Sequence, residues 1–279
     1  MLVACEESQR VCIEFRKLGH EAYSCDILEC SGGHPEWHIQ GDCVPLLNGR
    51  CEFTTLDGKR HNVQEKWDLI IAHPPCTYLT NAAVRMYSLK ATPAEKVVDR
   101  WEKRAKAAVF FMQFILADCD KIAVENPVGF MTSAYRKPDQ YINPYEFAPS
   151  KDSEEYVTKK TGLWLKNLPL LKRTNNFEKP LTEKYFSKYT NGYKSKVWCT
   201  SQKGKNRSKE RSKTFSSIAT AMAEQWGGNV TDNPELLKPS FKPEYLDGDP
   251  DAPICPNCRT PLNEMEDCDC GQKIDWSEE

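Results

Sequence analysis

Apolar residues in the first 130 positions form two alternating patterns, short continuous runs and longer stretches with helical spacing. The runs at 1–4, 22–25, 67–72 and 122–124 are bounded by polar or turn-forming residues, so each predicts a buried strand. Strands that alternate with helices along a chain build a mostly parallel sheet through βαβ units. The expected fold class is therefore α/β, with a Rossmann-like, mostly parallel sheet.

Two helices are expected between these strands, and a third later in the chain. Ser8 is the predicted N-cap of the first, and Gly19 is expected to end it. The third is expected over 215–226, before Gly227-Gly228. The second is expected over 93–118, and its spacing predicts seven core-facing residues: Val97, Trp101, Ala105, Ala108, Phe111, Met112 and Ile115.

Two of the predicted strands end on polar residues and proline, which cannot continue a strand ladder. The run 67–72 leads into His73-Pro74-Pro75-Cys76, and 122–124 leads into Glu125-Asn126-Pro127. Ligands of open α/β sheets bind outside the carboxyl ends of the strands. A thiolate fixed there can attack a substrate carbon, and a carboxylate can stabilise the developing charge. A turn cysteine and a helix-capping acid are the alternatives; Cys76 and Glu125 together favour a catalytic pair.

Composition indicates a water-soluble globular protein, with 39% hydrophobic and 28% charged residues among 279. No apolar run approaches the ~20 residues that span a bilayer, and Glu6 and Glu7 follow the apolar start too soon for a signal peptide. We therefore expect a cytoplasmic protein without a membrane partner. Its thirteen cysteines are expected to stay reduced, so that clusters of them bind metal or catalyse.

The formal net charge of -2 hides a strongly basic segment at 172–213. It carries thirteen Lys or Arg residues against three acids, with several tyrosines, Phe186 and Trp198 interleaved. A solvated basic loop is one interpretation, but aromatic residues among cations favour a surface that follows phosphates and stacks on bases. We expect this segment to be a DNA-contacting insertion within a domain that spans 1–228.

The end of the chain predicts a small metal-binding module. Residues 229–253 are acidic and rich in proline, which indicates a linker. Residues 254–279 follow with two close pairs of cysteines, and four thiolates on tight turns can surround Zn²⁺ tetrahedrally. We therefore predict a zinc-ribbon-like structural site. Its ligands are Cys255, Cys258, Cys268 and Cys270.

A second cluster with ligand-like spacing is not predicted to bind metal. Glycine and proline interrupt it, so its members are expected to be ordinary loop or cofactor-pocket residues. They are Cys30, His34, His38 and Cys43.

The residues at the two strand ends also resemble a known family. Pro74-Pro75-Cys76 resembles the Pro-Cys nucleophile motif of the cytosine-5 DNA methyltransferases, and Glu125-Asn126-Pro127 resembles their Glu-Asn-Val motif, in the same order along the chain. The resemblance covers most of 1–228 and is closest to small phage-type members. The segments that carry this closer likeness are 21–26, 38–42, 67–80 and 124–134.

The resemblance implies S-adenosyl-L-methionine as methyl donor and double-stranded DNA as substrate, with Cys76 as nucleophile and Glu125 as its partner acid. Lys160, in Lys159-Lys160-Thr161, is similar in place to the basic motif that supports the cytosine O2. The implied cofactor-binding residues are Cys5, Glu6, Asp26, Ile27, Asp42 and Pro74. The implied substrate-binding residues are Pro75, Thr77, Asn126 and Pro127. A phage protein of this kind would act in the host cytoplasm and protect viral DNA from restriction.

The first loop departs from the family pattern. Family members carry Phe-x-Gly-x-Gly after the first strand, whereas Cys5-Glu6-Glu7-Ser8-Gln9 contains no glycine. Two alternatives therefore stay open. An amino-methyltransferase acting on adenine N6 or cytosine N4 also carries a Pro-Pro pair after a strand, and Tyr78 would supply base stacking. A catalytically inactive methyltransferase fold would bind DNA through 172–213 and recruit a partner through the zinc module.

Overall fold

The computed structural model describes residues 1–186, 191–195, 213–228, 244–246 and 249–254. The chain divides into two compact units, Met1–Gly227 and Gly228–Glu279. In the second unit, strands β12 (Glu244–Leu246) and β13 (Asp249–Ile254) pair antiparallel. The four tail cysteines of the predicted zinc site, and most of the basic segment, lie outside the described residues.

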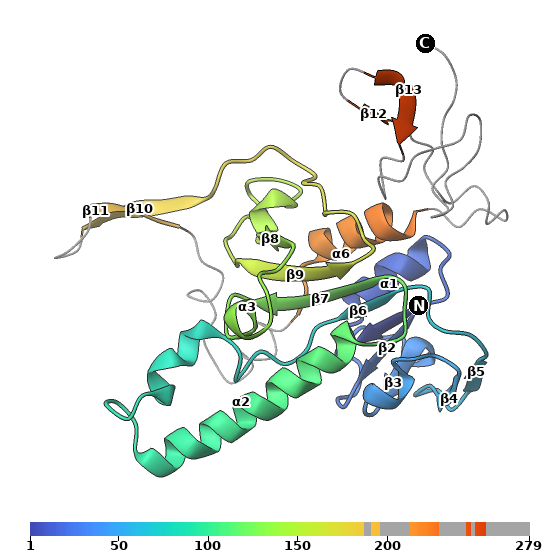
Figure 1. Ribbon diagram of the computed structural model, residues 1–279, viewed down its shortest axis with the longest axis horizontal. Coiled ribbons are helices and arrows are strands. Elements are labelled where there is room, and N and C mark those ends of the chain that lie inside the picture. The colour runs from blue at the N-terminus through green and yellow to red at the C-terminus, as the bar shows by residue number, and fades with distance from the viewer. Residues whose placement is uncertain (187–190, 196–212, 229–243, 247–248, 255–279) are drawn as a thin grey trace. The chain divides into compact units, whose positions relative to one another are not determined.

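A seven-stranded sheet organises the first unit (Figure 1). Its order is β3-β2-β1-β6-β7-β9-β8, in which the first five strands run parallel and β9 is antiparallel to both of its neighbours. Counted within the sheet, the five parallel strands have the order 3-2-1-4-5, which is compatible with a Rossmann-like fold. The α/β class and the mostly parallel sheet are confirmed. The strands are β1 (Leu2–Ala4), β2 (Tyr23–Asp26), β3 (His38–Gln40), β6 (Ile70–Ala72), β7 (Ile122–Pro127), β8 (Gln140–Ile142) and β9 (Thr161–Lys166).

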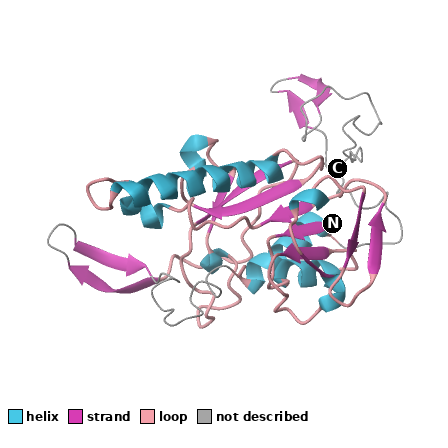
Figure 2. Ribbon diagram, turned by 90° about the horizontal axis from the view of Figure 1, so that it is seen from below, coloured by secondary structure: helices cyan, strands magenta, loops and turns pink. Residues whose placement is uncertain are grey.

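Both faces of the sheet are buried. Successive side chains of a strand point to opposite sides, so β1 and β6 each contribute to two hydrophobic clusters. Val3 and Ile71 contribute to one hydrophobic cluster, whereas Leu2, Ile70 and Ala72 contribute to the other. Helices cover both sides, as two views show (Figure 1, Figure 2).

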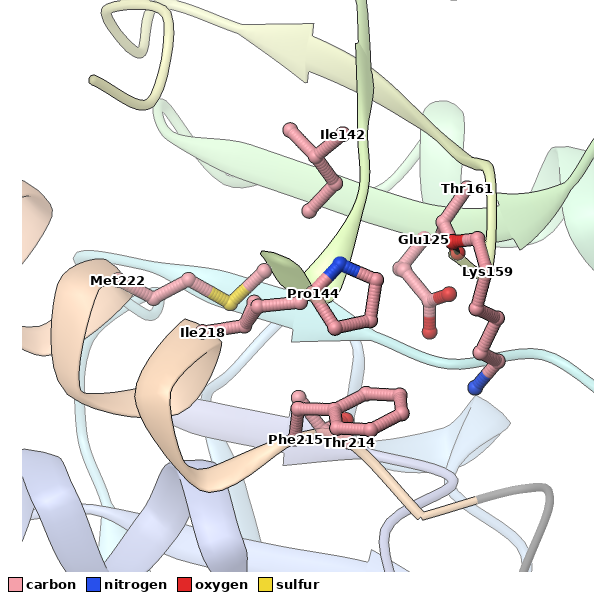
Figure 3. A pocket seen from close by; sticks show the side chains of 9 residues that line it. All are labelled: Glu125, Ile142, Pro144, Lys159, Thr161, Thr214, Phe215, Ile218 and Met222. Carbon is pink, nitrogen blue, oxygen red and sulfur yellow. Dashed lines mark hydrogen bonds between the residues drawn. The ribbon is translucent and has the colours of Figure 1, made fainter. Parts of the chain in front are cut away.

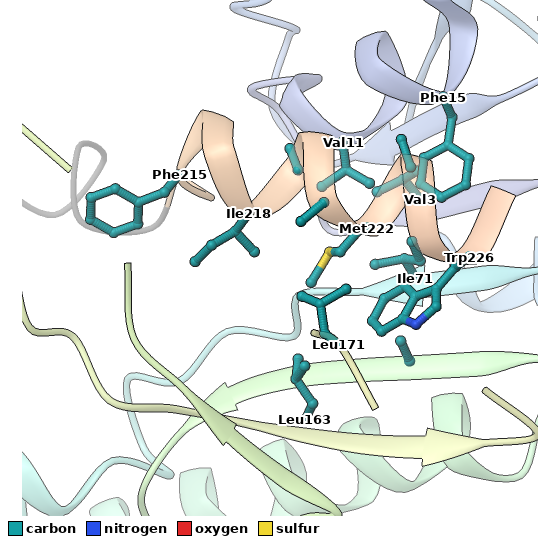
Figure 4. Packing of buried hydrophobic residues seen from close by; sticks show 14 of the residues in the cluster. Val3, Val11, Phe15, Ile71, Leu163, Leu171, Phe215, Ile218, Met222 and Trp226 are labelled. Atoms are coloured by element: carbon teal, nitrogen blue, oxygen red, sulfur yellow. The ribbon is translucent and has the colours of Figure 1, made fainter. Parts of the chain in front are cut away.

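The first cluster lies beneath α1 (Arg10–Lys17) and α6 (Ser216–Met222), which continues as a π-helical turn, η5 (Ala223–Gly227). Met222 and Trp226 pack there against Val3, Ile71 and Leu163 from the strands (Figure 4). The second cluster lies beneath α2 (Ala94–Ile115), where Phe111 meets Trp164 edge-on at 5.2 Å between ring centroids.

The predicted buried face of α2 is partly wrong. Trp101 is 45% exposed and Ala105 is also exposed, whereas Arg104 is buried with Val97, Phe111 and Phe114. The Arg104 guanidinium lies 3.3 Å from the centre of the Tyr87 ring, and its Nε donates to the Tyr78 carbonyl at 2.9 Å. Arg104 therefore lies on the buried side of α2, where its charge is held by an aromatic ring and a carbonyl. The spacing of apolar residues cannot indicate a buried cation.

The predicted start of α1 is also wrong. Gln9, not Ser8, is the N-cap, and it has a left-handed backbone with φ 58°. The Glu6 carboxylate performs the capping instead, because it accepts hydrogen bonds from the backbone amides of Val11 (2.6 Å) and Cys12 (3.2 Å). The predicted end is confirmed, since Gly19 follows the helix with φ 87°.

Several short elements were not predicted, because they are too short to show a period. They include β3, β8 and two antiparallel hairpins, β4 (Cys51–Thr54) with β5 (Arg60–Val63) and β10 (Leu181–Phe186) with β11 (Asn191–Ser195). The remaining helical turns are η1 (Pro35–Trp37), η2 (Val44–Leu46), η3 (Asn81–Tyr87), α3 (Met131–Ala134) and η4 (Pro144–Glu146). Among the described helices, none has both the length and the apolar character that crossing a bilayer requires.

Candidate active site

Three strand ends meet where the strand order of the sheet reverses. Ala4 of β1 pairs with Ala72 of β6, which in turn pairs with Val124 of β7. The next residues along the chain, Cys5, His73 and Glu125, therefore leave the parallel strands at the same level. A topological switch point of this kind is where open α/β sheets bind their ligands.

His73 and Glu125 form a buried pair at this level. His73 Nδ1 lies 2.9 Å from Glu125 Oε2, and the side chains are 6% and 16% exposed. Burial raises the pKa of Glu125, but the hydrogen bond from His73 and the charge of Lys159 outweigh it, so the net shift is downward. Burial lowers the pKa of His73, but Glu125 and the charge of Glu6 outweigh it and raise the pKa. The pair therefore favours an ionised carboxylate beside a protonated imidazole.

The sequence motif indicates His73 only as the residue that precedes Pro74-Pro75-Cys76. The signal that would have found it is positional, because His73 and Glu125 each follow the last residue of the parallel pairing between β6 and β7, Ala72 and Val124.

The loop that carries Cys76 is bound to the end of β7 and to the loop that follows it. Asn126 Nδ2 donates to the Pro74 carbonyl at 2.7 Å, and the Phe130 amide donates to the Leu79 carbonyl at 2.7 Å. A Cβ atom at Gly129 would overlap that same Leu79 carbonyl, so the close approach requires glycine. These contacts therefore fix the position of the Cys76 loop relative to β7, the strand that carries Glu125.

Within its loop, Cys76 begins a tight turn. Its carbonyl accepts hydrogen bonds from the amides of Leu79 and Thr80, both at 2.9 Å. The Cys76 side chain is half-buried, whereas Pro75 and Thr77 on either side are exposed. The thiol thus sits on an ordered backbone with exposed neighbours, which suits attack on a bound substrate.

No family model, curated protein or solved structure matches this chain.

A small pocket opens beside Glu125 (Figure 3). The Glu125 carboxylate and the Lys159 ammonium lie on the same side of it, next to Thr161. Apolar side chains, with Thr214, complete the lining: Ile142, Pro144, Phe215, Ile218 and Met222. The hollow has room for roughly one water molecule, so only the edge of a larger ligand could reach the Glu125 carboxylate there.

The basic residue at this pocket differs from the one predicted. Lys159 lines the pocket, whereas Lys160 points its Nζ at the ring of Tyr141, 4.1 Å from the centroid. The two lysines are adjacent in sequence just before β9, so their side chains leave the backbone in different directions. The path of the backbone before β9 therefore determines which of the two lysines lies beside Glu125.

The ends of β1 and β2 lie beside the end of β6 at the same edge of the sheet. Asp26 is the last residue of β2, and its carboxylate accepts a hydrogen bond from the Leu28 amide at 2.9 Å; burial raises its pKa. Ile27 beside it is 74% exposed, and Asp42 is exposed after β3. These residues lie where the sequence predicts a cofactor.

The glycine-free first loop adopts left-handed backbone at two residues, Cys5 with φ 59° and Gln9 with φ 58°. Non-glycine residues rarely take this conformation, so the fold imposes on the loop a path that glycine would follow more easily. Two predicted cofactor contacts face elsewhere. Glu6 caps α1 with its carboxylate, and the Cys5 thiol lies 3.9 Å from the Cys43 thiol.

The four residues with ligand-like spacing have other partners. His38 is buried, with Nδ1 2.9 Å from Ser24 Oγ and Nε2 2.9 Å from the Leu28 carbonyl, while His34 stacks on Trp37 at 3.9 Å. In the part of the chain that the structure describes, no group of three or more His, Cys, Asp or Glu side chains is arranged to hold a metal ion. The predicted zinc ligands of the tail lie outside that part.

Proposed function

We propose that this protein is a DNA methyltransferase that transfers a methyl group to C5 of cytosine. The observation that supports the proposal is the Asn126–Pro74 hydrogen bond, which ties β7, the strand that carries Glu125, to the loop that carries Cys76 at the switch point. This reaction needs a nucleophile and an acid at different positions of one flat ring, both held by rigid elements.

In the proposed reaction, the Cys76 thiolate adds to C6 of a cytosine that has been flipped out of the duplex. Glu125 hydrogen-bonds the ring nitrogen N3, and Lys159 at the same pocket stabilises the negative charge that develops on the ring. S-adenosyl-L-methionine supplies the methyl group. Loss of the C5 proton then restores the C5–C6 double bond and releases Cys76.

Three features at the ends of β1 and β2 fit S-adenosyl-L-methionine. In this proposal the Asp26 carboxylate accepts hydrogen bonds from ribose hydroxyls, and Ile27, which is exposed, contacts the adenine. The left-handed residues Cys5 and Gln9 bend the first loop where the chain leaves β1. Glu6 is not part of this set, because its carboxylate is occupied by the amides of α1.

We further propose that the basic segment 172–213 follows the DNA backbone, since its positive charge suits phosphate contacts. The predicted zinc module in the tail would have a structural role, because a set of four cysteines leaves no open coordination position for catalysis.

The test is mass spectrometry of nucleosides from DNA incubated with the protein and methyl-labelled S-adenosyl-L-methionine. We expect labelled 5-methylcytosine from the wild type, none from Cys76→Ala, and wild-type levels from the control Cys51→Ala on the β4–β5 hairpin. Label on adenine N6 or cytosine N4 would establish an amino-methyltransferase instead. Absence of label, with retained DNA binding, would favour an inactive DNA-binding protein.

A further inference from the structure

The buried pair His73–Glu125 bears on the source of a proton in the proposed reaction. When Cys76 adds to C6, the C5=C6 electron pair shifts to form C4=C5, and the C4=N3 pair moves onto N3, which takes up a proton. A carboxylate that is ionised beside His73 and Lys159 has no proton of its own to give. The proton must therefore come from a group behind it.

We propose that His73 is a positioning residue that acts through Glu125 and holds the proton which the cytosine ring takes up at N3. In this relay, His73 Nδ1–H passes its proton to Glu125 Oε2, and the carboxylic acid so formed then turns and donates that same proton to N3. His73 becomes neutral, Glu125 remains ionised, and N3 is protonated. When the adduct collapses, N3 returns the proton by the same path. This inference rests on the proposed function.

The geometry supports the relay at both ends. His73 Nδ1 is within hydrogen-bond distance of Glu125 Oε2 at 2.9 Å, and Glu125 lines the pocket that would hold the ring edge. The other ring nitrogen, His73 Nε2, is buried and has no hydrogen-bond partner in the described part of the chain. The imidazole can therefore gain or lose a proton without breaking a second contact.

Charged groups from three neighbouring segments act on His73. Glu125 on β7 and Glu6 in the loop after β1 both favour its protonated form, whereas Lys159, just before β9, opposes it. Burial also opposes it, and the two carboxylates prevail. Two acids around one buried imidazole hold a proton at the site near neutral pH, where histidine titrates.

The first experiment titrates His73 by NMR in the full-length protein labelled at histidine nitrogen, with the signal assigned by its loss in His73→Asn. We expect the wild-type pKa to lie above the ordinary value for histidine and to fall in Glu125→Gln. An unchanged His73 pKa in Glu125→Gln would overturn the inference, whether or not the protein methylates DNA.

The second experiment measures the pH dependence of methyl transfer in wild type and in His73→Asn. Asparagine places an amide donor where Nδ1 stood, so it keeps the hydrogen bond to Glu125 but carries no titratable proton. We expect kcat to fall about 10²-fold with little change in KM for DNA. The loss of wild-type activity as pH rises through the His73 pKa should also disappear.

The control is His61→Asn, on the separate β4–β5 hairpin, which should keep the wild-type profile. Wild-type kcat and pH profile in His73→Asn would overturn the relay while leaving the methyltransferase proposal intact. Absence of 5-methylcytosine from the wild type would instead overturn the proposed function and the relay that rests on it.

Discussion

Asn126 donates a 2.7 Å hydrogen bond from Nδ2 to the carbonyl oxygen of Pro74, and this bond joins the end of β7 to the segment that leads to Cys76. Asn126 is only 2% exposed. The family resemblance implies a substrate contact for Asn126, but its amide is used to hold the backbone on which the candidate nucleophile stands.

Replacing Asn126 with alanine should therefore weaken both stability and activity. The buried Pro74 carbonyl would lose its donor, and an unsatisfied buried acceptor costs about 1–3 kcal/mol. Urea unfolding measures the change. Asn62→Ala is the control, because Asn62 is exposed on β5 and its 3.3 Å bond to Glu52 is at the surface. Equal unfolding free energies for the two variants would contradict the anchoring role.

Gly129→Ala should separate the two loops. The added Cβ would overlap the Leu79 carbonyl, so the hydrogen bond from the Phe130 amide would lengthen or break. Forced rearrangement of a packed site costs about 1–3 kcal/mol. We expect this loss in chemical denaturation, together with reduced methylation. Gly41→Ala is the stability control, because a Cβ there meets no atom within 4 Å. If Gly129→Ala is as stable as Gly41→Ala, the contact between the loops is not tight.

Lys159→Met should reduce methylation more than Lys160→Met. Lys159 lowers the pKa of Glu125 by its charge and lines the same pocket, whereas Lys160 lies over Tyr141. Loss of Lys159 should let the pKa of Glu125 rise and slow single-turnover methyl transfer about 10-fold or more. Lys151→Met controls for the loss of a lysine that lies over a ring, here that of Phe177 at 5.8 Å. A larger loss of methyl transfer in Lys160→Met would show that Lys160, the residue that the resemblance indicates, is the basic residue of the site.

Glu6 should make stability depend on pH. Burial raises the pKa of its carboxyl from 4.5 to about 7, although His73 and the amides of Val11 and Cys12 lower it. Because the pKa is higher in the folded state, the stabilising contribution is fully present below about pH 4.5 and is lost as pH rises through about 7.

Denaturation at pH 5 and pH 8 tests this directly. We expect the wild type to lose on the order of 2–3 kcal/mol more over this interval than Glu6→Gln, which has no titrating group. Glu36→Gln should behave like the wild type, because Glu36 is exposed and the hydrogen bond from His34 lowers its pKa. Parallel pH curves for wild type and Glu6→Gln would show that Glu6 titrates normally.

Much of the fold could be predicted because its signals are local. The runs around β1, β2, β6 and β7 are continuous and apolar, and proline after β6 and in β7 marks where the ladder ends. The same prolines placed Cys76 and Glu125 at strand ends. Short elements such as β3 and β8 could not be predicted, since three residues do not establish a period.

The α/β class, the order of the main strands and helices, and the two residues on which the functional hypothesis rests all follow from local patterns in the sequence. The contacts between distant residues follow only from the folded chain: His73 with Glu125, Pro74 with Asn126, Lys159 at the pocket beside Glu125, and Glu6 at the start of α1. The physical reason is that strand adjacency and the rotation of each helix are set by packing between segments far apart in the chain. Such contacts leave no trace in the spacing of residues along one segment.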